Sequence, residues 1–99
     1  MFKPKPLKFD RKSLKGISER QITLHYEKHY ASYITARNKI EETLASGDLS
    51  HVRELKKNES HNASGQVLHE LYFDNLGGNG GEPKGALMKK IKEDFGSYE

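Results

Sequence analysis

The sequence predicts an all-α fold, a long antiparallel hairpin of two helices followed by a third helix. Two stretches, residues 18–46 and 60–76, carry apolar and aromatic side chains at helical spacing, and no strand-like alternation competes with them. The run Gly77-Gly-Asn-Gly-Gly-Glu-Pro83 then breaks the chain, and an amphipathic segment follows it. Because a first helix of about 27 residues is long for a compact bundle, we expect a hairpin.

Composition limits the class of protein. Ninety-nine residues are enough for one domain. With 33% hydrophobic and 31% charged residues, the composition is polar for a domain that folds alone. We therefore expect apolar faces that are covered by something outside this chain. The absence of cysteine excludes disulfides and thiolate metal sites. No apolar run approaches membrane length and the first residues lack an apolar signal core, so we expect no membrane partner and a cytoplasmic location.

Residues 1–16, here called the lead-in, form an extended basic segment before the helices. It contains six of the 17 lysines and arginines, one aspartate and a few apolar residues that can lie on the domain. Its positive charge therefore exceeds the net +3 of the whole chain, and the remainder is slightly acidic. A basic arm can bind nucleic acid or steer small anions, but a solvated tail is the more common explanation. Nucleic acid is therefore not expected as a partner.

The first helix has clear start and stop signals. Ser18-Glu-Arg-Gln21 has the spacing of a capping box, and Gly47 can end the helix in a left-handed conformation after Ala45 or Ser46. Within it, His25, His29 and Tyr33 step by four and form one polar row. An apolar stripe lies beside that row: Ile22, Tyr26, Ile40 and Leu44. A buried row of imidazoles and a phenol needs hydrogen-bond or metal partners.

The remaining chain predicts two further helices. Residues 48–59 suggest a short helix or turn, after which Ser60 or Asn62 caps the second long helix, which carries His69. The third helix runs from about Gly85 until Gly96 stops it. We therefore divide the chain into the lead-in, a hairpin domain of residues 17–83, and residues 84–99, a helix leading to a further domain.

Two histidines are the leading metal-ligand candidates. His25 and His69 each lie mid-helix, where facing side chains of an antiparallel pair can share a metal. Core histidines satisfied by hydrogen bonds are an equally open interpretation. The pair His25 and His29 does not match the zinc-protease motif, because no glutamate directly follows the first histidine. We expect His51 and His61 to be solvated.

The glycine cluster of residues 77–81 invites a phosphate-loop interpretation. It lacks the lysine and serine or threonine pair of such loops, and no strand precedes it. A flexible turn between helices explains it better.

Three motifs in the right order resemble the iron/manganese superoxide dismutases. Leu24-His-Tyr-Glu-Lys-His-Tyr-Ala-Ser-Tyr33 looks like their first helix, and the stretch from Asn62 through His69 to Leu76 is similar to their second. Asn79-Gly-Gly-Glu-Pro-Lys-Gly85, followed by Ile91 to Ser97, resembles the segment leading into their second domain. The likeness covers nearly all of residues 16–99.

The resemblance implies a fold, an activity and a ligand set. In the family each long helix of the hairpin gives one histidine to the metal, here His25 and His69. His29 and Tyr33 would lie in the funnel through which superoxide reaches it. A C-terminal α/β domain supplies an aspartate and a histidine, and solvent completes the shell. Because the Asp-x-Trp-Glu-His signature of that domain is absent, we expect these residues to be the N-terminal half of a homo-oligomeric dismutase and to be inactive alone.

The residue four positions before His69 bears on the choice between manganese and iron as the bound metal. Iron-type members have a glutamine four residues before the second ligand, whereas Gly65 stands there, as in manganese-type members. Gln66 is one residue away. Tyr30, Leu68 and Phe73 replace a histidine, an asparagine and a tryptophan that are common in the family. Gly65, in the place of the glutamine of iron-type members, is what favours manganese.

Two rivals from other classes remain. One is a small basic helical module that binds nucleic acid or a partner helix, which would not need His25 and His69 to face each other and would show strongly salt-dependent binding. The other is an autonomous metal carrier that uses the two histidines without a second domain.

Overall fold

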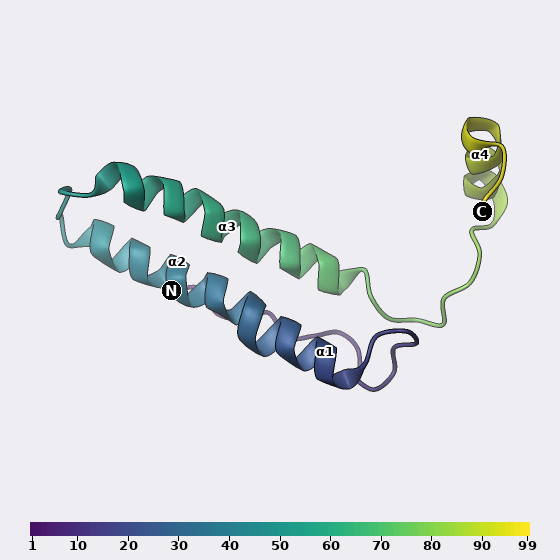
Figure 1. The fold of residues 1–99 in the computed structure, drawn as a ribbon, viewed down its shortest axis with the longest axis horizontal. Coiled ribbons are helices and arrows are strands. Elements are labelled where there is room, and N and C mark those ends of the chain that lie inside the picture. Colours follow the sequence, from purple (N-terminus) through teal and green to yellow (C-terminus); the bar gives the residue numbers. More distant parts are fainter.

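The computed structural model describes all 99 residues and contains helices only, as predicted. The first arm of a hairpin consists of α1 (Glu19–Thr23), η1 (Leu24–Tyr30) and α2 (Ala31–Ala45), joined end to end. The second arm is α3 (Val52–Asp74), which runs antiparallel beside it, and α4 (Gly85–Phe95) follows at the end of a linker (Figure 1). The predicted hairpin with a third helix is confirmed.

The ends of the first arm match the sequence signals. Ser18 Oγ accepts a hydrogen bond from the Gln21 backbone N–H at 3.1 Å, which satisfies one of the free donors at the helix start. After Ala45 the chain reaches Gly47, whose φ of +81° is easily adopted by glycine and rarely by other residues. The chain can therefore turn back toward α3 within a few residues.

A π-helical segment, η1, interrupts the first arm at the predicted polar row. It carries both His25 and His29, and the Ala31 backbone N–H that ends it reaches back five residues to the Tyr26 carbonyl. Such segments are rare and are frequent at functional sites, because the extra residue in the turn redirects nearby side chains. Sequence periodicity predicted one uniform α-helix here.

The second arm begins earlier than predicted. The structure has one continuous helix from Val52, so Ser60 and Asn62 lie inside α3 and do not cap it. Residues 52–64 contain no glycine or proline, so nothing in the backbone breaks the helix. Asn62 instead donates its side-chain amide to the Asn58 carbonyl at 2.8 Å.

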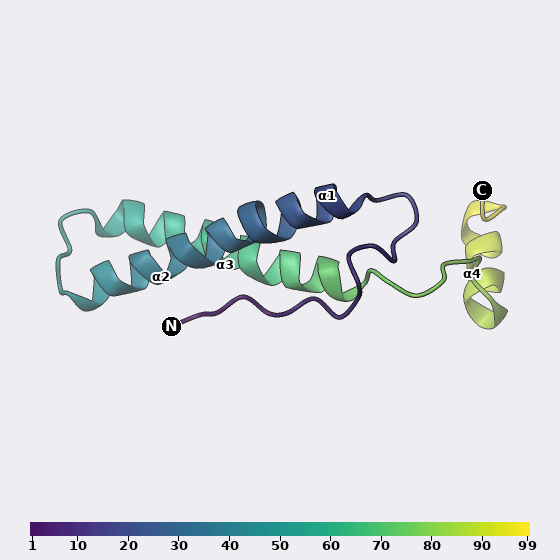
Figure 2. The same ribbon diagram turned by 90° about the horizontal axis from the view of Figure 1, so that it is seen from below.

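The lead-in packs along one face of the hairpin (Figure 2). Its side chains Phe2, Leu7 and Phe9 contact a buried cluster formed by Tyr30, Ile34 and Phe73. The Asn38 amide clasps the start of the chain, because its Oδ1 accepts from the Phe2 N–H at 2.8 Å and its Nδ2 donates to the Phe2 carbonyl at 2.9 Å. The lead-in therefore covers one side of the core with partly buried side chains.

Several cations of the lead-in are paired with acidic side chains of the helices. Lys5 Nζ lies 2.6 Å from Asp74 Oδ2, and Lys8 Nζ lies 3.7 Å from Asp74 Oδ1. Arg11 binds the Glu27 carboxylate at 2.8 Å and the Thr23 hydroxyl at 3.1 Å. The basic segment is thus neither a fully solvated tail nor a free arm, which weakens the nucleic-acid interpretation.

The core is thin and the molecule is elongated. Only six side chains are buried: Ile22, Tyr30, Ile34, Ile40, Gln66 and Phe73. The radius of gyration is 18.8 Å, whereas a compact domain of this size has one of about 13 Å. Helix α4 makes no contact with any other helix, and its Phe95 side chain is 80% exposed.

None of the helices combines the length and apolar character that crossing a membrane requires.

Candidate metal centre

His25 on η1 and His69 on α3 face each other across the hairpin. Their ring centroids lie 5.0 Å apart, with the rings nearly perpendicular at 87°. Nδ1 of His69 lies 2.7 Å from the Gly65 carbonyl oxygen. A carbonyl only accepts, so Nδ1 carries the proton and the lone pair of the neutral ring is on Nε2. Metal-binding histidines are commonly oriented by such a bond.

His29 and Tyr33 extend this pair along the first arm. The ring centroid of His29 lies 5.8 Å from that of His25 and 4.9 Å from that of His69, and the Tyr33 hydroxyl lies 3.5 Å from His29 Nε2. The row at steps of four is therefore present. The expectation that it is buried is wrong for His29, which is exposed because it lies at the edge of the face covered by α3.

The surroundings of His25 favour its neutral form. Its half-buried ring packs against the rings of Tyr72 and Phe73, at centroid distances of 5.2 and 5.1 Å. Burial lowers the pKa of His25 below its ordinary value, and the neighbouring His69 and His29 lower it further. A neutral imidazole is the form that binds a metal.

The two histidines open onto a shallow hollow of about 240 Å³, which they line together with Leu68 and Tyr72. No group of three or more histidine, aspartate or glutamate side chains is arranged around one point in the structure. Two imidazole nitrogens can form part of the coordination shell of iron or another borderline metal. They can also bind manganese when oxygen ligands complete its coordination shell. The residues present therefore fit one part of an iron or manganese site.

Gly65 has a steric reason to be glycine. A Cβ atom at this position would lie 2.4 Å from Tyr33 Cδ1 and 2.5 Å from Cε1, far inside van der Waals contact. The Tyr33 ring thus rests directly on the backbone of α3. A longer side chain at residue 65, such as glutamine, cannot be accommodated while Tyr33 keeps this place.

A buried polar network, which the sequence did not indicate, lies on the other side of the hairpin. Gln66 accepts a hydrogen bond from Arg37 Nη1 at 3.0 Å and donates to Glu70 Oε1 at 3.2 Å. The Tyr30 hydroxyl donates to the same Glu70 oxygen at 2.9 Å and accepts from the Lys5 N–H at 2.9 Å. Burial raises the pKa of Tyr30 to about 12. The spacing of seven between Gln66 and Phe73 was the available signal that both share one face.

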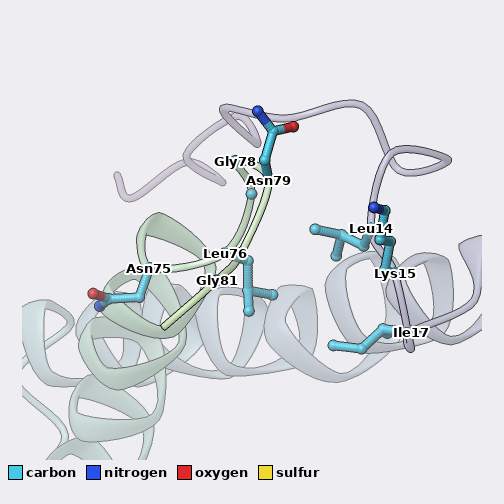
Figure 3. A pocket seen from close by; sticks show the side chains of 10 residues that line it. Leu14, Lys15, Ile17, Asn75, Leu76, Gly78, Asn79 and Gly81 are labelled. Carbon is cyan, nitrogen blue, oxygen red and sulfur yellow. The ribbon is translucent and has the colours of Figure 1, made fainter. Parts of the chain in front are cut away.

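The other predicted features lie apart from this centre. His51 and His61 are exposed, although the His61 ring lies 5.7 Å from that of Tyr33. A cavity of about 410 Å³ separates Leu14 and Ile17 from Leu76 and the glycine-rich segment (Figure 3). Exposed Lys15 is the one cation that lines it, so it gives no support to a phosphate-loop interpretation.

Comparison with known proteins identifies the family. A profile described as iron/manganese superoxide dismutases, alpha-hairpin domain, matches residues 1–77. The chain belongs to the iron/manganese superoxide dismutase family. The match covers the lead-in and both arms of the hairpin, which are the elements that carry His25 and His69.

Similar superoxide dismutases include both metal types. Manganese superoxide dismutase 2 of Haloferax volcanii is 41% identical over 100 residues, which cover 95% of this chain and 50% of that protein. An iron superoxide dismutase of Aquifex aeolicus is 45% identical over 98 residues, covering 88% of this chain and 46% of that protein. An iron superoxide dismutase of Cupriavidus metallidurans is 38% identical over 104 residues, which cover 100% of this chain and 52% of that protein. The chain spans about half the length of these superoxide dismutases.

Proposed function

We propose that this chain is the N-terminal half of a superoxide dismutase, in which His25 and His69 hold one manganese or iron ion. The observation that supports the proposal most directly is the meeting of these two rings, at 5.0 Å, from opposite arms of the hairpin. The hydrogen bond from His69 to the Gly65 carbonyl supports it further, because it leaves Nε2 available. A helical interaction module would need neither feature.

The bound ion would supply the redox couple by which two superoxide anions and two protons become dioxygen and hydrogen peroxide. Tyr33 and His29 would hold protons beside it, since the Tyr33 hydroxyl and His29 Nε2 lie 3.5 Å apart and each can donate or accept. The exposed position of His29 lets solvent replenish a proton there. His25, whose neutral form is already favoured in this setting, and His69 would orient the ion.

Two imidazoles complete only part of such a shell, so we propose that a C-terminal domain supplies an aspartate and a histidine, and that the whole enzyme is a homo-oligomer. The apolar side chains around the pair, such as half-exposed Leu24 and Leu68, provide a surface for covering residues. The 99-residue chain alone would lack appreciable activity.

We further propose manganese over iron. The support is the packing of the Tyr33 ring on Gly65, which excludes from residue 65 the glutamine of iron-type members. The similar proteins do not decide this point, because they include both types.

The test is reconstitution with the C-terminal domain of the Haloferax volcanii relative, added as a fusion or in trans. Superoxide consumption and metal content are measured together after loading with manganese or iron. We expect metal binding and activity to appear, and His25→Ala and His69→Ala to abolish both. Tyr33→Phe should slow turnover while the metal stays bound, because it removes only a hydroxyl.

His51→Ala is the matched control, since this exposed histidine lies outside the centre, and it should change neither quantity. Full activity of the 99-residue chain alone would contradict the proposed division of ligands. So would a reconstituted His25→Ala protein that keeps its metal and its rate.

A further inference from the structure

Two side-chain hydrogen bonds join the two arms of the hairpin, and both belong to the buried polar network. The Tyr30 hydroxyl, at the end of η1, donates to Glu70 Oε1 on α3 at 2.9 Å. Arg37 Nη1 on α2 donates to Gln66 Oε1 on α3 at 3.0 Å. Gln66 Nε2 donates in turn to the same Glu70 oxygen at 3.2 Å. The proposed function uses none of these residues.

The Tyr30 ring connects this network with the candidate metal ligands. The ring is fully buried and lies nearly parallel to that of His69, at a centroid distance of 6.4 Å and an angle of 19°. It also meets the ring of Phe73 at 5.8 Å, and Phe73 packs against His25 at 5.1 Å. Glu70, which anchors the hydroxyl, is the residue directly after His69. Tyr30 therefore contacts one candidate ligand directly and the other through Phe73.

The Tyr30 hydroxyl is held from both sides. It donates to Glu70 and accepts from the Lys5 backbone N–H at 2.9 Å. Pro4 and Pro6 flank Lys5 and have no N–H of their own, so Lys5 is the backbone donor of this stretch, and the following proline favours an extended backbone there. Any movement of the hydroxyl would break two hydrogen bonds at a buried side chain, which is unfavourable.

No hydrogen bond joins the arms on the side of the histidine pair. The His25 ring makes no hydrogen bond, and His69 bonds to Gly65 of its own helix at 2.7 Å. The distance between the two rings therefore depends on where the backbones of η1 and α3 lie relative to each other. Because ligand side chains must be held within about 0.5 Å of the geometry that binding requires, a bond that fixes these backbones also fixes the pair.

We propose that Tyr30 and Glu70 are positioning residues for the pair of candidate metal ligands. Their hydrogen bond holds η1 and α3 at the separation that brings the rings of His25 and His69 to 5.0 Å. Neither residue contacts the ion: Tyr30 acts through the ring of His69, and Glu70 acts through Tyr30. The inference rests on the proposed function, since the spacing of the pair matters for the metal that the pair would hold.

The first measurement uses the 99-residue chain without metal. With ring centroids 5.0 Å apart, the ring protons of His25 and His69 should give a nuclear Overhauser effect in the parent chain. Tyr30→Phe and Glu70→Leu should each weaken it, because either change removes the bond between the arms. Glu70→Gln keeps an oxygen that can accept from Tyr30 and should restore the effect.

The second measurement is the manganese affinity of the reconstituted two-domain protein, determined by competition with a chelator. Tyr30→Phe and Glu70→Leu should each lower it about tenfold, since partners that orient ligands have effects of this order. Because both changes remove the same bond, the double variant should lose little more than either single variant. Glu70→Gln should bind manganese nearly as well as the parent protein.

Tyr26→Phe is the matched control, because it removes a hydroxyl from the same helical segment. The Tyr26 hydroxyl donates to the Lys5 carbonyl at 2.8 Å and does not reach α3, so its loss should change neither measurement. Ile40→Val tests for general destabilisation, since this buried side chain near the end of α2 takes no part in the network. Circular dichroism checks that each variant is folded, and if Glu70→Leu is not, Tyr30→Phe decides.

An unchanged ring-to-ring effect and an unchanged affinity in Tyr30→Phe would overturn the inference. An equal loss in Tyr26→Phe or Ile40→Val would also overturn it, because the role would then be one of general stability. Failure of the proposed function looks different: the reconstituted parent protein would bind neither manganese nor iron, while the ring-to-ring effect would still depend on Tyr30 and Glu70. Metal held through His25 and His69 whatever stands at residues 30 and 70 would refute the positioning role alone.

Discussion

The two faces of the hairpin differ in how they are covered. On one face the lead-in lies over Tyr30, Ile34 and Phe73, which are at most 4% exposed. On the other, His25 and His69 are bordered by exposed side chains such as Leu68, at 63%. The buried contacts that stabilise the hairpin therefore lie on the lead-in side, and the candidate metal ligands lie on the open side. Apolar substitutions on the two faces should separate stability from metal binding.

Removing a core side chain on the covered face should have the largest effect on stability. Ile34→Ala deletes three buried carbon atoms and should lower the free energy of unfolding by about 2–5 kcal/mol, which can unfold a chain with so thin a core. Leu68→Ala on the open face is the matched control and should change it by less than about 1 kcal/mol. Urea denaturation of both variants is the measurement, and equal losses would show that the two faces do not differ.

Gly65→Ala should have an intermediate effect, because it adds a methyl group where α3 touches Tyr33. The new Cβ overlaps the ring, so Tyr33 must move, and overpacking of this kind lowers stability by about 1–3 kcal/mol. Ser64→Ala, at the exposed neighbouring position, should be nearly neutral. Adding Tyr33→Ala to Gly65→Ala should relieve the clash in the same denaturation experiment. A double variant no better than additive would contradict this explanation.

Tyr30→Phe should have the smallest effect, about 0.5–1.5 kcal/mol, because it removes one hydroxyl from the network with Glu70. Its clearer signature is in pH dependence. Ultraviolet titration of the five tyrosines should show one phenol with a pKa of about 12, and this component should be missing in the variant.

The direction of the accompanying stability change follows from this pKa. Since the folded pKa of Tyr30 is above the unfolded value of about 10, folding retains a proton that the unfolded chain releases. The contribution is fully present below pH 10 and is lost as pH rises toward 12. A parent chain and a variant with the same stability profile above pH 10 would contradict the assignment.

The local signals in the sequence predicted the outline of the fold well. Ser18 and Gly47 delimit the first arm because a side-chain cap and a left-handed residue act locally, without help from the rest of the chain. The start of α3 at Val52 was not predicted, because Ser60 and Asn62 are residue types that favour the N-cap position. Such residues cap a helix only where the helix begins, and here the helix continues through both of them.

The candidate site was predictable in part. The resemblance paired His25 with His69, and their rings do meet, although their role as ligands remains a prediction. The π-helical segment was not predictable from the sequence. The spacing between Gln66 and Phe73 indicated a shared face, but the burial of Gln66 depends on partners far away in the sequence. Polar residues in the middle of a helix are usually solvated, and only the contact with Arg37 and Glu70 explains this exception.

The lead-in has a consequence for the order in which the protein is made. The lead-in leaves the ribosome before the helices that it contacts, yet Phe2 is hydrogen-bonded to Asn38, 36 positions later, and Lys5 pairs with Asp74, 69 positions later. The lead-in cannot make its contacts with Phe73 and Asp74 until α3 has been synthesised. The lead-in is therefore translated before both arms but reaches its final place after them, and until then Ile34 and Phe73 lack the side chains that cover them.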